Sequence, residues 1–72
     1  MKTKDLPAYY NDDFGMLIVQ FELMRHAKQF AQIFNFESVM RCTCDDCDAP
    51  LAAKKMTSQE AFVFALVNEL DY

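Results

Sequence analysis

A stripe of polar side chains runs through an otherwise apolar stretch, residues 14–36. Its members are Glu22, Arg25, Gln29 and Gln32. Steps of three and four residues keep side chains on one face of an α-helix. Phenylalanine, leucine, methionine and valine occupy most of the other positions. The pattern therefore predicts a long amphipathic helix over about residues 12–35.

Signals for helix starts and stops flank this stretch. Asn11, Asp12 and Asp13 are all able to cap a helix start, and Asn35 is the first stop signal. Residues 16–21 are rich in strand-forming side chains and could also form a β-strand. We prefer the helix because one period joins them to the residues that follow, with no turn residue between. Residues 36–41 fit either another helical turn or a short new helix.

A second helix is predicted over about residues 58–70. Thr57 and Glu60 match the T-x-x-E capping box that marks helix starts. The expected core face consists of Phe62, Val63, Leu66, Val67 and Leu70, with Ala61 and Ala65 alongside. Phe64 falls outside this face, so a monomer would leave its ring in water.

These elements predict an all-α fold in which a single domain covers residues 1–72. Residues 1–10 are expected to be an extended arm, because Pro7 disfavours helix around it. A loop rich in cysteine and aspartate covers residues 42–50, and residues 50–55 could form a short helix.

A hairpin of two amphipathic helices hides only one face of each helix. We therefore expect the chain to dimerise as a helical bundle. The candidate interface residues are Phe14, Leu17, Phe21, Met24 and Phe64. This excess of apolar surface is the main sequence-level indication of a binding role.

The charge balance narrows the class of partner. The 72 residues include 7 basic and 11 acidic side chains, a net charge of −4. Such a chain is repelled by phosphate, so neither nucleic acid nor an anionic membrane surface is an expected partner. No uncharged apolar run approaches the roughly 18 residues of a membrane span, and the first residues do not resemble a secretory signal. We expect a cytoplasmic protein.

Cys42, Cys44 and Cys47 form a dense cluster that could hold a soft metal ion. Zinc needs four ligands, so His26, a nearby aspartate or another chain would have to complete the site. A zinc-stabilised structural or adaptor protein is therefore an alternative hypothesis, beside a solvated loop with no metal. The last two cysteines also have redox C-x-x-C spacing, which makes a thiol redox sensor a weaker alternative. The odd number of cysteines favours a reducing compartment.

The sequence does not contain a pattern typical of catalysis. We find no triad, no paired carboxylates and no phosphate-binding loop, and so short a helical chain could hardly enclose a reaction cavity. His26 follows Glu22 by four residues, the spacing of a surface pair on a helix. The resulting hypothesis is a small acidic protein–protein interaction module that is not an enzyme and needs no cofactor. An inhibitor or regulator that binds a basic surface on its target would fit this description.

Overall fold

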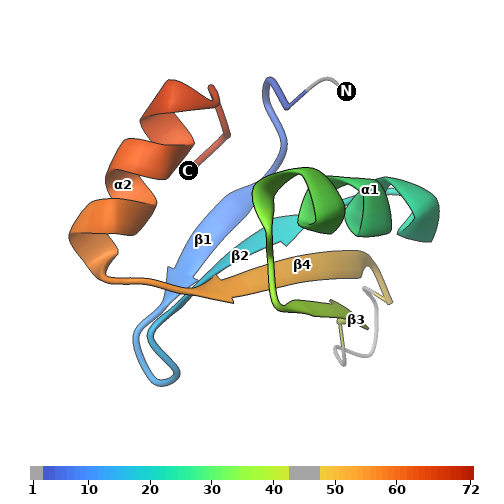
Figure 1. The fold of residues 1–72 in the computed structure, drawn as a ribbon, viewed down its shortest axis with the longest axis horizontal. Coiled ribbons are helices and arrows are strands. Elements are labelled where there is room, and N and C mark those ends of the chain that lie inside the picture. Colours follow the sequence, from blue (N-terminus) through green and yellow to red (C-terminus); the bar gives the residue numbers. More distant parts are fainter. Residues whose placement is uncertain (1–2, 43–47) are drawn as a thin grey trace.

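The computed structural model describes residues 3–42 and 48–72 and shows an α+β fold (Figure 1). The described elements are β1 (Ala8–Asn11), β2 (Met16–Gln20), α1 (Met24–Phe34), β3 (Ser38–Arg41), β4 (Pro50–Lys55) and α2 (Ser58–Val67). Within these residues, the strands form one antiparallel sheet in the order β1-β2-β4-β3. Both helices lie on the same side of the sheet (Figure 1). The predicted all-α hairpin, and the bundle built from it, are therefore wrong.

Strand β2 occupies the first half of the predicted long helix. Leu17 and Val19 are fully buried beneath the helices, whereas Met16, Ile18 and Gln20 are half-buried on the opposite face. This alternation has the period of a strand. Helix α1 begins only at Met24, and its N-cap residue makes no capping hydrogen bond through its side chain. The true start of α1 thus leaves no capping signal in the sequence.

The polar residues expected to start that helix instead shape the β1–β2 hairpin. The Asn11 side-chain oxygen accepts hydrogen bonds from the backbone N–H groups of Asp13 (2.9 Å) and Phe14 (3.2 Å). Gly15 then takes a left-handed conformation with φ of 63°, which costs glycine little. Asparagine and aspartate favour such turns for the same reason that they favour helix starts. Their short side chains accept hydrogen bonds from nearby backbone N–H groups.

The other strands also occupy segments assigned differently from the sequence. Residues 8–10, expected in an arm, belong to edge strand β1, and the undecided residues 36–41 contain β3. The short helix expected over residues 50–55 is strand β4, which lies between β2 and β3. Its first four residues are all buried. A strand covered on both faces lacks the alternation that identifies strands in a sequence.

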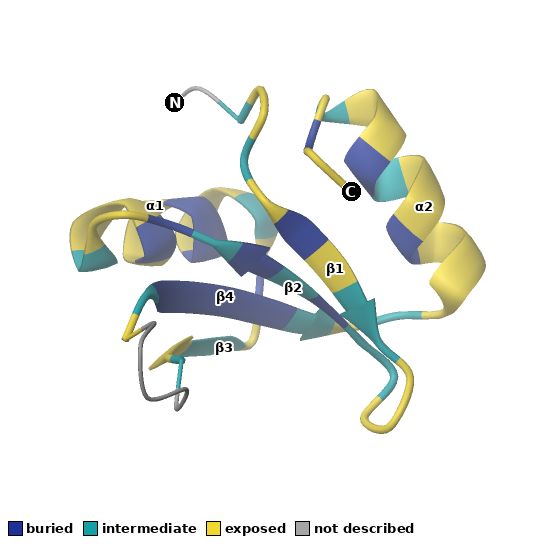
Figure 2. Ribbon diagram, turned by 180° about the vertical axis from the view of Figure 1, so that it is seen from behind, coloured by how far each residue is buried: buried dark blue, intermediate teal, exposed yellow. Residues whose placement is uncertain are grey.

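The core lies between the sheet and the two helices (Figure 2). Phe30 of α1 is fully buried at its centre, and its ring centroid lies 5.2 Å from that of Phe21, 4.6 Å from Phe34 and 4.9 Å from Phe36. Helix α1 packs mainly against β4 and β3, and α2 packs against β2 and β1. Helix α1 follows the β1–β2 hairpin but covers the β3–β4 hairpin. Helix α2 follows the β3–β4 hairpin but covers the β1–β2 hairpin.

Helix α2 starts where the sequence predicts but buries a different face. The capping box is confirmed: the Thr57 hydroxyl accepts from the Glu60 backbone N–H at 3.1 Å, and the Glu60 carboxylate accepts from the Thr57 backbone N–H at 3.0 Å. The buried helix residues are Ala61 and Ala65, which allow the helix to approach the sheet closely. Ala61, Ala65 and Leu70 are buried as predicted, but the other four residues of the predicted core face are exposed. Phe64 is half-buried, so its predicted exposure to water is wrong.

The capping box makes the stability of α2 sensitive to acid. The hydrogen bond from the Thr57 backbone, and then the contact with the Thr57 side chain, lower the pKa of Glu60 below the ordinary glutamate value. This contribution to stability is present above the unfolded-state pKa of about 4.3 and is lost as pH falls through the lowered folded-state pKa. We expect the urea midpoint of the original chain to fall between neutral pH and about pH 3. The midpoint of Glu60→Gln should fall less over the same pH range.

Glu22→Gln is the matched control, because it removes an exposed carboxylate outside the capping box. An equal change in acid sensitivity for both variants would show that the capping box is not the source of the effect.

Candidate functional site

The outer side of α2, away from the sheet, is exposed (Figure 2), and several of its residues are large and apolar. Phe62, Val63, Leu66 and Val67 have exposed fractions of 56%, 51%, 68% and 73%. We call these four residues the α2 outer face. Single exposed apolar residues are ordinary on protein surfaces, but a cluster on one helix face marks a candidate interaction site.

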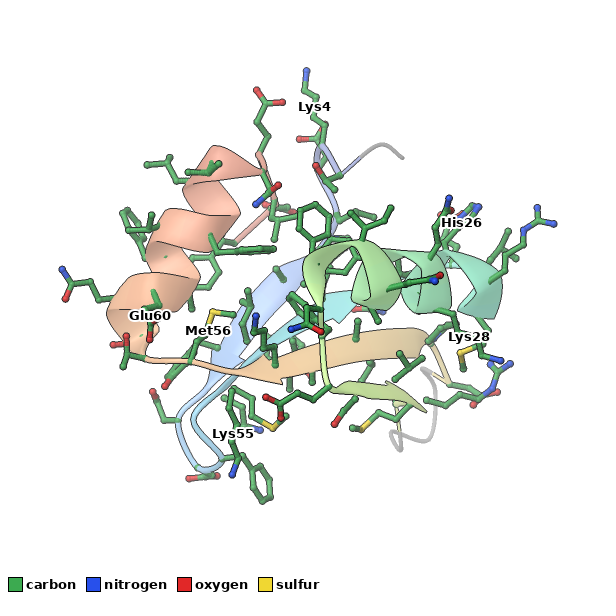
Figure 3. All side chains as sticks on the ribbon, viewed as in Figure 1. Lys4, His26, Lys28, Lys55, Met56 and Glu60 are labelled. Atoms are coloured by element: carbon green, nitrogen blue, oxygen red, sulfur yellow. The ribbon has the colours of Figure 1, made fainter. Side chains whose placement is uncertain are left out.

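The α2 outer face has the shape of two parallel ridges. Phe62 and Leu66 lie four residues apart along the helix, as do Val63 and Val67. Rows with this spacing are the ridges that fit into the grooves of another helix. Glu60 lies in the first turn of α2, at the N-terminal end of these rows (Figure 3).

Two hollows flank the α2 outer face. The first, of about 570 Å³, is lined by Gln59, Glu60, Val63, Phe64, Val67 and Asn68. The second, of about 250 Å³, is lined by Phe62, Ala65, Leu66, Leu70, Asp71 and Tyr72. Each hollow contains one carboxylate among its lining residues, Glu60 in the first and Asp71 in the second, and the other lining residues are uncharged.

Phe64 forms the inner wall of the first hollow and joins α2 to α1. Its ring centroid lies 5.5 Å from that of Phe34 and 5.6 Å from that of Phe36. Aromatic pairs at these separations add to the stabilisation from burial alone. Phe64 therefore fixes the position of α2 beside α1, and replacing it would disturb the fold as well as any interface.

The C-terminal end of α2 carries an unfavourable residue. Glu69 adopts a left-handed conformation with φ of 57°, a position where glycine is strongly preferred. The last turn of α2 also lacks a basic residue, so the carboxylate stands near the negative end of the helix dipole. Glu69 thus disfavours the folded helix end both through its backbone and through its charge.

Replacing Glu69 with glycine should therefore stabilise the chain. We expect Glu69→Gly to raise the free energy of unfolding by about 1 kcal/mol, because glycine adopts positive φ without the steric cost that a Cβ imposes. Urea unfolding followed by circular dichroism measures the change. Glu69→Ala removes the charge but keeps the Cβ, so it should gain much less. If alanine stabilises as much as glycine, charge and not backbone strain is the cause.

A second apolar surface lies on the sheet face opposite the helices. A hollow of about 370 Å³ there is lined by Asn11, Phe14, Met16, Ile18, Met40, Leu51 and Ala53. Phe14 and Met40 are exposed to 70% and 46%, but Leu51 and Ala53 are only 6% and 2% exposed. Neighbouring side chains already shield much of this face, so the α2 outer face presents the more exposed apolar surface.

The five predicted interface residues do not share one exposed surface. Leu17 and Phe21 are buried in the core, with exposed fractions of 0% and 3%. Phe14 lies in the β1–β2 hairpin, and Met24 and Phe64 are half-buried against the core. An interface role for these residues, and the expected homodimer, stay predictions. The four residues of the α2 outer face were visible in the sequence but were assigned to the core.

The predicted metal ligands are not assembled by the described residues. Cys44 and Cys47 lie outside the described residues, and Cys42 follows β3 with its backbone N–H donating to the Ala49 carbonyl at 2.8 Å. His26 is exposed and points away from the sheet on the outer side of α1 (Figure 3). Across residues 3–42 and 48–72, no three cysteine, histidine or acidic side chains are grouped to hold a metal ion. Because Cys44 and Cys47 are not described, the alternative of a zinc site with His26 as a ligand stays a prediction.

Comparison of the chain with protein-family models, with curated proteins and with solved structures found no match. Among the helices of the described residues, none combines the length and the apolar character needed to cross a bilayer. The proposals below therefore depend on the geometry and chemistry of the chain itself.

Proposed function

We propose that this chain is a small, non-enzymatic protein–protein interaction module that docks through the α2 outer face. The observation that carries the proposal is the exposure of four large apolar side chains, each more than half exposed, on one side of one helix. A helix that is apolar on all sides is usually buried on all sides. Residues 61–67 of α2 are apolar on all sides, but the sheet covers only the Ala61 and Ala65 side. A partner would bury the remaining apolar surface and gain roughly 25 cal/mol per Å² removed from water.

The contacts at both ends of α2 support a preformed docking surface. The capping box holds its start. Beyond its end, the Asp71 backbone N–H donates to the Leu6 carbonyl at 2.8 Å, and the Ala8 N–H donates to the Asp71 carbonyl at 2.9 Å. These bonds attach the segment after α2 to the edge of the sheet. A helix held in this way loses little conformational freedom when a partner binds.

The charges favour a basic target. The chain has 11 acidic and 7 basic side chains, and every described charged side chain is exposed or half-buried, where a partner can reach it. Such a surface suits a regulator or inhibitor that binds a basic patch on another protein. The odd number of cysteines supports a reducing compartment, and we propose the cytoplasm.

Removing the apolar character of the α2 outer face tests this function. We expect the double variant Leu66→Gln, Val67→Gln to capture at least about tenfold less of any specific partner from extract of the native organism, because interface energy is concentrated in a few buried apolar side chains. Quantitative mass spectrometry of the captured proteins gives the measurement. Both positions are highly exposed, so the unfolding midpoint should change little.

Ile33→Gln is the matched control. Ile33 is also an exposed aliphatic residue, 56% exposed, but it lies on α1. Equal capture by the original chain, the double variant and the control would exclude the α2 outer face as the docking surface.

A further inference from the structure

We infer that the occupant of the α2 outer face is an amphipathic helix of a target protein whose apolar stripe is bordered by lysine or arginine on both sides. This inference rests on the proposed function and adds the chemical class of the partner. It combines three observations: the ridges of the outer face, the carboxylates beside it, and the cost of Glu69.

The ridges indicate a helical partner. The Phe62–Leu66 and Val63–Val67 rows leave a groove between them into which the side-chain ridge of a second helix fits. Hollows lie on both sides of these rows, and each includes residues of the outer face in its lining. A helix laid along α2 therefore has space on both sides for the longer side chains that border its apolar stripe.

The carboxylates indicate the charge of those bordering side chains. Glu60 lines the first hollow and Asp71 lines the second, while α2 itself contains no lysine or arginine. A long basic side chain can lie along apolar surface and place its charge at the edge. Lysine or arginine on each border of a docked helix would thus meet a carboxylate of opposite charge.

Glu69 supports the same conclusion. Its left-handed backbone and its position at the negative helix end both work against the stability of α2. Stability therefore does not explain a glutamate here. Glu69 directly precedes Leu70 and Asp71, which line the second hollow. Its negative charge would add to the attraction of a basic partner, and residues that break a local rule are expected at functional sites.

The same charges disfavour a second copy of the chain. An antiparallel pair of α2 helices would place Glu60 of each copy toward Glu69 and Asp71 of the other. A parallel pair would place Glu60 beside Glu60. Both arrangements bring like charges together between molecules of net charge −4. The face is thus better suited to a basic partner than to itself.

Selection from a displayed peptide library tests the inference. Each helical peptide carries the same leucine stripe, and its bordering positions are open to lysine, glutamate, glutamine and serine. We expect peptides selected on the original chain to be enriched in lysine on both borders and to bind less tightly as salt rises. Their affinity should fall roughly tenfold for the charge variant Glu60→Gln, Asp71→Asn. Glutamine still completes a capping box, so this variant keeps the start of α2.

The apolar variant Leu66→Gln, Val67→Gln separates the two proposals. If it abolishes binding but the selected peptides show no lysine preference, the basic partner is excluded and the docking face stands. If no peptide binds, or if the apolar variant binds as the original chain does, both proposals are overturned. Sedimentation analysis completes the test: self-association that the apolar variant abolishes would identify a second copy as the occupant and exclude the basic helix.

Discussion

Replacing Phe30 with alanine should remove most of the free energy of unfolding of this chain. The Phe30 ring is fully buried and contacts the rings of Phe21, Phe34 and Phe36. Truncation of a buried phenylalanine typically costs 3–5 kcal/mol, because the lost burial is followed by a cavity. A small domain has a total stability of roughly 5 kcal/mol at the low end of the common range. Urea titration followed by circular dichroism would show the unfolding midpoint shifted to a much lower urea concentration.

Phe62→Ala supplies the comparison, since it makes the same chemical change on an exposed ring. Phe62 is 56% exposed and contacts the ring of Tyr72 at a centroid distance of 6.3 Å. We expect it to cost less than about 1 kcal/mol. Equal losses for the two variants would contradict the assignment of Phe30 to the core and Phe62 to the surface.

Two neighbouring residues of β2 should respond very differently to truncation. Leu17 is fully buried beneath the helices, whereas Ile18 faces the hollow on the opposite side of the sheet. We expect Leu17→Ala to lower the free energy of unfolding by about 2–4 kcal/mol and Ile18→Ala by about 1 kcal/mol. Urea unfolding of both variants measures the difference.

The pair tests the strand assignment directly. Adjacent residues of a strand point to opposite faces, so the contrast depends on the β2 register. A larger loss for Ile18→Ala than for Leu17→Ala would mean that the opposite face of this segment is the buried one.

The features of the helices that could be predicted are those marked by side chains close to them in the sequence. The capping box of Thr57 and Glu60 places the start of α2, and Asn35, with φ of 60°, ends α1 where the stop signal stood. Arg25, Gln29 and Gln32 are all exposed on α1, as the polar stripe requires. Local side-chain chemistry determines these features, so they can be read from the sequence.

The central strand pairing of the sheet could not be predicted because it is non-local. Residues 16–20 become a strand by pairing with residues 51–55, which lie far along the chain. The Ala-Ala-Lys-Lys portion of β4 has no strand preference of its own. Leu23, the N-cap residue of α1, has no side-chain group that accepts a hydrogen bond, so the sequence does not mark where β2 ends and α1 begins. Tertiary pairing overrides local propensity in such segments.

The candidate site was missed for a related reason. Residues 61–67 are all apolar, so periodicity could not show which side of α2 meets the sheet. Ala61 and Ala65, four residues apart, are the signal that could have identified that side, because two small residues in one row allow close approach. With these two residues against the sheet, the four residues of the α2 outer face lie on the opposite side of the helix.

Because each helix covers the hairpin that it does not follow, the order of synthesis also affects how the chain folds. Helix α1 packs mainly on β4 and β3, which are synthesised after it. The N-terminal half therefore emerges from the ribosome with an apolar helix face before the strands that cover most of that face have been made. Productive folding must wait for the second hairpin, and the nascent first half is the stage at which this chain most needs protection from aggregation.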